Sequence, residues 1–186
     1  MKNKLRKNFI LYGGVSMSMI GNFFRTDNKT VQEIQKGELF LFDLVYDENG
    51  IIDDDSILTI DKAWHAIHFA LSGVVWDCDS TNDPLSKVVV SGNFVNDEDM
   101  GYGPAMFVTD KEVYDINSSL KMISKDWFRA KFSVSDMLAN EIYSVAEDED
   151  ADEDEFFDYI YSYLEQVIAF FEKAANNNQY ILFFIN

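Results

Sequence analysis

The chain has 186 residues, 47% of them apolar, and its 33 acidic side chains outnumber 15 basic ones to give a formal net charge of −18. This apolar content suffices for a folded core, which excludes a wholly disordered chain, and the lack of any run of about 18 apolar residues excludes a membrane span. The negative charge repels nucleic-acid phosphates and anionic lipids, so neither is expected as a partner.

The single cysteine, Cys78, cannot form an internal disulfide or a cysteine-based zinc site, which favours a reducing, cytoplasmic setting. Its neighbours Asp77 and Asp79 disfavour a thiolate, so Cys78 is a poor candidate for a nucleophile.

Residues 1–16 are interpreted as an extension of the domain. Basic residues precede the apolar run Phe9–Tyr12, as in a signal peptide, but the run stops at Gly13 and no cleavage site follows. A Gly-Gly pair can be encoded by a ribosome-binding sequence, and here it lies just before Met17. We therefore predict a leader that the native protein lacks, followed by one domain over residues 17–186.

The first part of the domain predicts several short elements and one well-defined helix. Residues 61–72 carry Trp64, Ile67, Ala70 and Leu71 at the spacing of a buried helix face, and Gly73 closes the helix. Four elements come earlier: an extended opening at 17–24, a helix at 30–36 that ends at Gly37, an apolar stretch at 39–46 that fits helix or strand, and a turn at 47–50.

Two strands are predicted next. Lys87–Ser91 is a β-branched segment typical of a strand, and Ala105–Val108 is another short strand, with a turn-rich loop over 97–104 between them. Thr109 and Glu112 have the spacing of a capping box, which predicts that a helix begins there and continues to about residue 123.

The last part of the domain predicts two short helices over 125–139, with Ser133 or Ser135 as a cap, and then one long helix. Glu147–Glu155 holds eight acids in nine residues and leads into this helix, 156–175. Tyr180–Ile185 is an uncharged strand, which is safest in the middle of a sheet. Because the elements do not alternate as βαβα, we predict a single α+β domain with a small mixed or antiparallel sheet.

The polar residues of helix 61–72 are the first candidate site. Asp61, His65, His68 and Ser72 fall within about 60° of one another at 100° per residue. Such a seam fits a carboxylate that orients one imidazole while the other performs acid–base work. The favoured interpretation is that Asp61 is an N-cap or first-turn acid and that the histidines are partly buried and hydrogen-bonded. H-x-x-H is weaker than H-E-x-x-H, so no metal or cofactor is assigned, and Asp61, His65 and His68 stay weak catalytic candidates.

The loop at residues 101–105 is the second candidate. Gly101 and Gly103 flank Tyr102 and allow the backbone to approach a ligand or partner closely, although the loop lacks the spacing of a phosphate loop. The favoured interpretation is a tight turn that presents Tyr102 to the core.

Four blocks of sequence then suggest a family. M-S-M-I-G at 17–21, D-K-A-W-H-A-I-H-F at 61–69, G-Y-G-P-A at 101–105 and E-I-Y at 141–143 occur in this order. Together they resemble the YfbM-like family, a bacterial domain of unknown function, over nearly the whole chain from Met17. The resemblance implies a cytoplasmic α+β domain and brings no activity.

Two functions are compatible with these residues. The favoured one is a non-catalytic module whose acidic, aromatic surface binds a basic protein, as an antagonist of a toxin does. The alternative is a small hydrolase or ligand-binding enzyme with a pocket at Asp61, His65, His68 and Tyr102, favoured if these side chains line one open pocket and disfavoured if the histidines point into the core. The residues expected to bind the partner are Trp64, Gly101, Tyr102, Gly103, Glu147, Asp148, Glu149 and Asp150.

Overall fold

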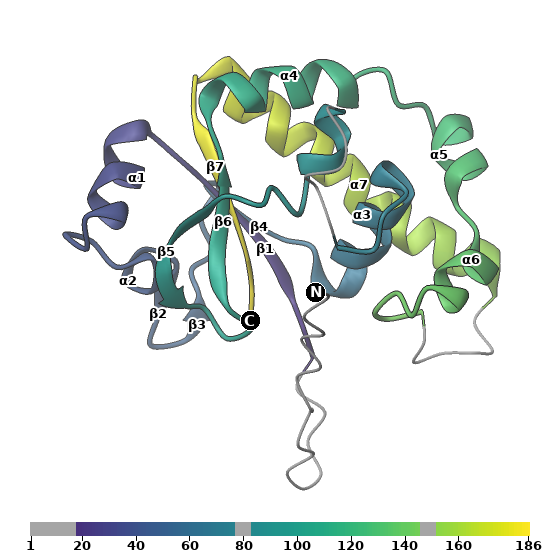
Figure 1. Cartoon of the computed structure of the whole chain (residues 1–186), viewed down its shortest axis with the longest axis horizontal. Coiled ribbons are helices and arrows are strands. Elements are labelled where there is room, and N and C mark those ends of the chain that lie inside the picture. The colour runs from purple at the N-terminus through teal and green to yellow at the C-terminus, as the bar shows by residue number, and fades with distance from the viewer. Residues whose placement is uncertain (1–17, 77–82, 146–151) are drawn as a thin grey trace, which may run out of the picture.

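The computed structural model describes residues 18–76, 83–145 and 152–186. Within these residues the strands form a five-stranded antiparallel sheet in the order β4-β1-β7-β6-β5 and a small hairpin of β2 and β3 (Figure 1). The strands are β1 (Gly21–Thr26), β2 (Tyr46–Asp47), β3 (Gly50–Ile51), β4 (Ile57–Thr59), β5 (Phe94–Asp99), β6 (Pro104–Val108) and β7 (Tyr180–Ile185).

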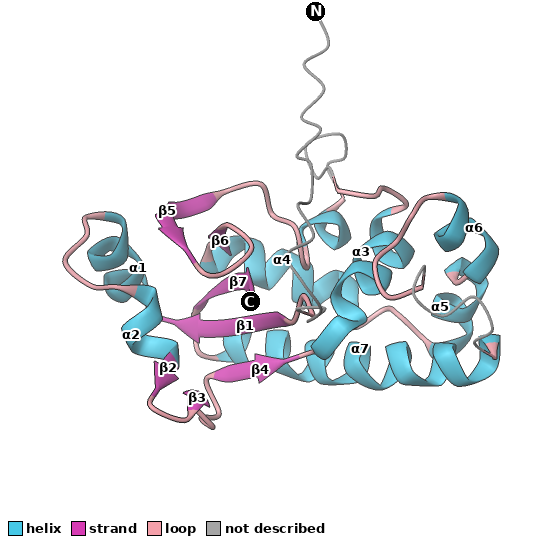
Figure 2. Cartoon of the chain, turned by 90° about the horizontal axis from the view of Figure 1, so that it is seen from below, coloured by secondary structure: helices cyan, strands magenta, loops and turns pink. Residues whose placement is uncertain are grey.

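Helices lie on both faces of the large sheet (Figures 1 and 2). Helices α1 and α2 cover one face, and α3, α4 and α7 cover the other. The α-helices are α1 (Asn28–Gln35), α2 (Leu41–Val45), α3 (Trp64–Ser72), α4 (Asp110–Leu120), α5 (Lys125–Lys131), α6 (Val134–Ala139) and α7 (Glu153–Asn176), and the 3₁₀ helices are η1 (Asp61–Ala63) and η2 (Pro84–Lys87).

Strand β7 divides the core in two, as the alternation of side chains along a strand requires. Ile181 and Phe183 face the larger core, under α3, α4 and α7. Leu182 and Phe184 face the smaller core, under α1 and α2. The prediction that the uncharged strand lies inside the sheet is confirmed, since β1 and β6 pair with its two edges.

Several local predictions are confirmed. Thr109 and Glu112 form a complete capping box at the start of α4, and the Ser133 hydroxyl accepts the Asp136 N–H at the start of α6. Gly73 ends α3 in the left-handed conformation, with φ of 73°. The ambiguous stretch at 39–46 is mostly helical, because α2 occupies residues 41–45 of it.

The strand predicted at Lys87–Ser91 is wrong. Asp83 accepts the Leu85 N–H and Pro84 occupies the first position of η2, so the chain enters this segment as a 3₁₀ helix. The valines that follow are all buried, because this segment packs its side chains against the sheet instead of pairing with it. The strand that pairs with β6 is instead β5, which extends to Asp99, within the stretch predicted to be a loop.

No helix in residues 18–76, 83–145 and 152–186 has both the length and the apolar character that crossing a membrane requires.

Candidate functional site

His65 is fully engaged in hydrogen bonds. Its Nδ1 accepts the Tyr143 N–H at 2.9 Å, which leaves Nε2 to donate to the Val75 carbonyl at 2.8 Å. The side chain is 7% exposed, and burial lowers its pKa, so the ring is neutral at pH 7. With both nitrogens used, His65 has no lone pair left for a metal or a substrate proton.

His68 is more deeply buried and has a different environment. It is 1% exposed, and neither ring nitrogen has a hydrogen-bond partner among the described residues. Burial lowers its pKa to about 4, with a smaller contribution from nearby His65, so this ring too is neutral at pH 7. Both histidines of the predicted seam therefore belong to the core.

Asp61 does not orient either imidazole. It lies in η1 with φ of 47°, so the regular helical spacing that placed it beside His65 does not hold there. Its carboxylate accepts the Tyr159 hydroxyl of α7 at 2.9 Å. The described residues contain no group of three or more His, Cys, Asp or Glu side chains that could hold a metal ion.

The glycine–tyrosine loop is tied to the end of β7. The Asp99 carboxylate accepts the N–H groups of Gly101 and Gly103, each at 2.9 Å, and the Tyr102 N–H donates to the Ile185 carbonyl at 3.1 Å. Gly101 has φ of 127°, and a Cβ there would lie 3.0 Å from the Asn186 Cα, so both conformation and space require glycine. The partly buried Tyr102 packs against the larger core.

An aromatic cluster of Trp64, His65, Trp76 and Tyr143 surrounds the start of α3. Trp64 lies parallel to His65 at 4.7 Å and to Tyr143 at 5.9 Å, and Trp76 meets Trp64 edge-on at 5.8 Å, all between ring centroids. Trp64 is 2% exposed, whereas Trp76 is 51% exposed. The cluster therefore exposes the Trp76 side chain to solvent and packs it against the buried Trp64.

The cluster also anchors the beginning of the domain. The Trp64 indole N–H donates to the Met19 carbonyl at 3.1 Å, and the Met19 N–H donates to the Tyr143 hydroxyl at 2.8 Å. Gly21 lies so close that a Cβ there would be 2.7 Å from the Trp64 Cβ. Residues that are far apart in the sequence are thus joined by a short chain of hydrogen bonds and close packing.

The acidic tract lies only partly within the described residues, because Glu147, Asp148, Glu149 and Asp150 fall outside them. Asp152 caps α7 by accepting the Asp154 N–H at 2.8 Å. Arg129 of α5 lies 2.5 Å from the Asp154 carboxylate and 3.6 Å from that of Glu153. The described acids of this tract are therefore partly neutralised within the chain.

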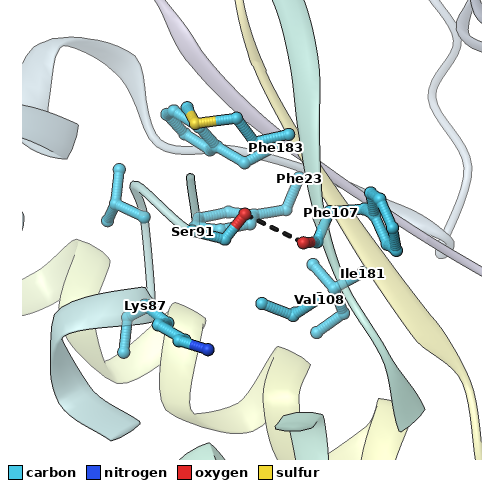
Figure 3. Close-up of a pocket in the computed structure, with 10 residues that line it drawn as sticks. Phe23, Lys87, Ser91, Phe107, Val108, Ile181 and Phe183 are labelled. Atoms are coloured by element: carbon cyan, nitrogen blue, oxygen red, sulfur yellow. Dashed lines mark hydrogen bonds between the residues drawn. The ribbon is translucent and has the colours of Figure 1, made fainter. Parts of the chain in front are cut away.

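Two hollows lie elsewhere on the sheet. The first lies between residues 87–91 and strands β6 and β7, where the Ser91 hydroxyl donates to the Phe107 carbonyl at 2.8 Å (Figure 3). Its volume of about 10 Å³ has room for roughly one water, so it is a packing gap. The second, a groove of about 490 Å³ between β4 and α7, has the size of a binding site.

Sequence reasoning did not identify Trp76, Tyr143 or the groove. Tyr143 could have been found, because it belongs to the E-I-Y block that suggested the family. Trp76 has no helical or strand spacing that distinguishes it, and it simply ends an apolar stretch after Gly73. The groove joins residues more than 100 positions apart, which no local pattern reveals.

Comparison with known proteins identifies the family. A model of the family described as "Domain of unknown function (DUF1877)" matches residues 17–184. The chain belongs to this family. It is similar to Protein YfbM of Escherichia coli (strain K12), with 25% identity over 168 residues that cover 89% of this chain and 97% of the relative.

The fold has also been seen in a crystal. The crystal structure of YfbM from Escherichia coli, described as a protein of unknown function, matches with a TM-score of 0.66 and 23% identity over 90% of this chain and 100% of that one. The YfbM-like resemblance and the α+β fold are therefore confirmed. Three of the four sequence blocks that carried the resemblance contribute Met19, Trp64 and Tyr143 to the hydrogen-bonded region described above.

Proposed function

We propose that this protein is a non-catalytic binding module for a basic protein, in the manner of an antagonist that blocks a toxin. The observation that carries the proposal is the half-exposed ring of Trp76, held edge-on by the buried Trp64. Tryptophan is enriched among the residues that dominate binding energy at interfaces, because a large rigid ring buries much area at little entropic cost. A solvent-exposed tryptophan on a rigid base is such an anchor.

Charge supplies the second part of the proposal. The net charge of −18 favours encounters with positively charged proteins. Acids also follow two residues of the aromatic cluster in the sequence: Asp77 and Asp79 are one and three positions after Trp76, and Glu147–Asp150 begins four positions after Tyr143. In this proposal the acids attract the partner and Trp76 retains it.

The remaining candidate residues take defined roles. Trp64 is buried, so it supports Trp76 and does not contact the partner itself. Tyr102, between Gly101 and Gly103, supplies a second contact, since part of its surface is accessible. We place the encounter in the cytoplasm, the compartment that suits a chain with one cysteine.

The buried histidines favour this function over the enzyme alternative. Both ring nitrogens of His65 form hydrogen bonds with backbone groups, and the His68 side chain is buried. Asp61 is bonded to Tyr159 and not to an imidazole. These three residues support the fold, and the proposal needs neither a cofactor nor a bound metal.

The test is capture of the partner from cells that produce the protein, followed by binding kinetics on whatever is captured. Trp76→Ala is expected to speed dissociation about tenfold or more, because the anchor is lost. Replacing Glu147, Asp148, Glu149 and Asp150 with Gln or Asn should instead slow association, as should raising salt from about 50 to about 300 mM.

The matched control is Tyr114→Ala, which removes another exposed aromatic side chain, 64% accessible on α4. It is expected to leave both rates unchanged. The proposal would be contradicted by an acidic partner. It would also be contradicted by a partner that dissociates from Trp76→Ala as slowly as from the native protein. A hydrolytic activity that disappears in His65→Ala, while circular dichroism shows that this variant is still folded, would restore the enzyme alternative.

A further inference from the structure

Strand β4 forms an open edge of the five-stranded sheet (Figure 2). Its hydrogen bonds to β1 flank Leu58, with Arg25 N–H donating to the Ser56 carbonyl and Ile60 N–H donating to the Gly21 carbonyl, both at 2.9 Å. Because such bonds alternate along an antiparallel strand, the backbone groups of Ile57 and Thr59 point away from β1. The Ile57 N–H is bonded to Asp54, but the N–H and carbonyl of exposed Thr59 face outward.

A groove of about 490 Å³ lies beside this edge. Its apolar surface comes from β4 and from the C-terminal half of α7, and acidic residues of the preceding loop form its rim. The apolar side chains are Ile57, Leu58, Ala169 and Phe170, and the polar ones are Asp53, Asp54, Asp55, Gln166 and Lys173.

The rim carries more negative than positive charge. Asp55 forms ion pairs with Arg25, at 2.6 Å, and with Lys173. Within the described residues neither Asp53 nor Asp54 forms an ion pair. The Asp54 carboxylate accepts the Ser56 hydroxyl and N–H, and these bonds hold its pKa below the usual value. Two exposed carboxylates without an ion pair among the described residues thus lie beside an apolar groove and an open strand edge.

We propose that this groove binds an extended, basic segment of another protein, which pairs with β4 as a further strand. Addition of a strand to a sheet edge supplies main-chain hydrogen bonds, and alternate side chains enter adjacent pockets. Here Thr59 supplies the backbone groups, the groove accepts apolar side chains, and Asp53 and Asp54 attract Lys or Arg. A second copy of this chain does not fit, because pairing β4 with itself brings two acidic loops together.

This site shares no residue with the aromatic cluster, so the groove can be tested independently of the proposed function. The probe is a labelled hexapeptide of alternating lysine and valine, titrated with the full chain and followed by fluorescence anisotropy. Saturable binding is expected. A peptide with every backbone amide N-methylated, which cannot donate to the ladder in either strand orientation, should bind about tenfold more weakly or worse, and a glutamate–valine peptide should not bind.

Two pairs of variants locate the site. Asp53→Asn with Asp54→Asn keeps the turn acceptor for Ser56 and should weaken binding about tenfold. Its control, Asp43→Asn with Asp47→Asn, removes two exposed carboxylates elsewhere, one of which also caps a turn, and should have little effect. Ala169→Trp should block the groove, whereas Ser162→Trp, exposed on the same helix outside the groove, should not.

Each other outcome overturns the inference. Absence of saturable binding excludes the site, and equal weakening by both double variants means that only net charge attracts the peptide. Equal binding of the N-methylated peptide excludes strand addition, and normal binding by Ala169→Trp excludes the groove. Loss of binding in Trp76→Ala would assign the peptide to the aromatic cluster. Normal binding in that variant leaves the groove inference intact even if the proposed function fails.

Discussion

Helix α3 and the first turn of α7 both carry clustered ionisable side chains, and the fold uses them in opposite ways. His65 and His68 are buried, and burial lowers the pKa of each, so both are held neutral. Asp152, Glu153 and Asp154 are exposed, and Arg129 pairs with the latter two at the surface. An ionisable residue therefore marks a binding surface only where its surroundings leave it both charged and accessible.

The largest effect that this comparison predicts is the loss of His65. His65→Ala leaves the Tyr143 N–H and the Val75 carbonyl without their partner and opens a cavity beside Trp64, so the free energy of unfolding should fall by about 4 kcal/mol. His68→Leu is the matched control, because His68 makes no side-chain hydrogen bond among the described residues and should cost less than about 1 kcal/mol at pH 7.

Urea unfolding followed by tryptophan fluorescence measures both variants. A loss below about 1 kcal/mol in His65→Ala would show that the imidazole does not support the fold. A metal ion that copurifies with the native protein and is absent from His65→Ala, while circular dichroism shows that this variant is still folded, would show that the ring has a ligand role.

The next effect is a dependence of stability on pH that His68 causes. Its pKa is lowered from 6.5 to about 4 in the folded chain, so the unfolded chain binds the proton more tightly. The contribution of neutral His68 to the free energy of unfolding is therefore fully present above pH 6.5. It is lost as the pH falls towards 4, which lowers the free energy of unfolding by about 3 kcal/mol.

Carboxylates and His65 also titrate in acid, so the relevant quantity is the difference between the native chain and His68→Leu. Stability of the native chain relative to this variant should decline between about pH 7 and about pH 4, as measured by urea unfolding at each pH. A difference that stays constant over this interval would mean that His68 is not buried as a neutral ring.

The smallest effects belong to the exposed acids of α7. Asp152→Ala removes the cap that accepts two N–H groups and should cost about 1 kcal/mol. Asp154→Ala removes a surface ion pair with Arg129 and should cost less than about 0.5 kcal/mol, with the difference vanishing at high salt. Thermal unfolding at low and high salt compares the two variants. A larger loss of stability for Asp154→Ala than for Asp152→Ala would show that the ion pair stabilises the protein more than the helix cap does.

Local signals in the sequence predicted the elements whose causes are local. Thr109 and Glu112 need only each other and the backbone between them, so the capping box gave the correct start of α4. Gly73 was recognised as the end of α3 because a left-handed residue favours glycine. The failure at Lys87–Ser91 has a non-local cause, since three buried valines satisfy strand propensity and core packing equally well.

The candidate site shows the same division. The sequence placed Asp61 and His65 on one helix face, but the left-handed conformation of Asp61 in η1 breaks the helical spacing. The Asp61 carboxylate instead accepts a hydrogen bond from the Tyr159 hydroxyl of α7. Only the packing of α7 against η1 decides that partner. The position of the Trp76 ring likewise depends on its edge-on contact with Trp64, which is 12 residues earlier in the sequence.

The sequence by itself determined the family, the α+β class, the negative net charge and the central position of β7. These follow from composition, from short-range spacing and from the four sequence blocks. The tertiary structure decided which polar groups are buried, which carboxylates lack an ion pair and where the open sheet edge meets a groove. Burial and hydrogen bonding depend on residues brought together from distant parts of the chain, and no short segment contains that information.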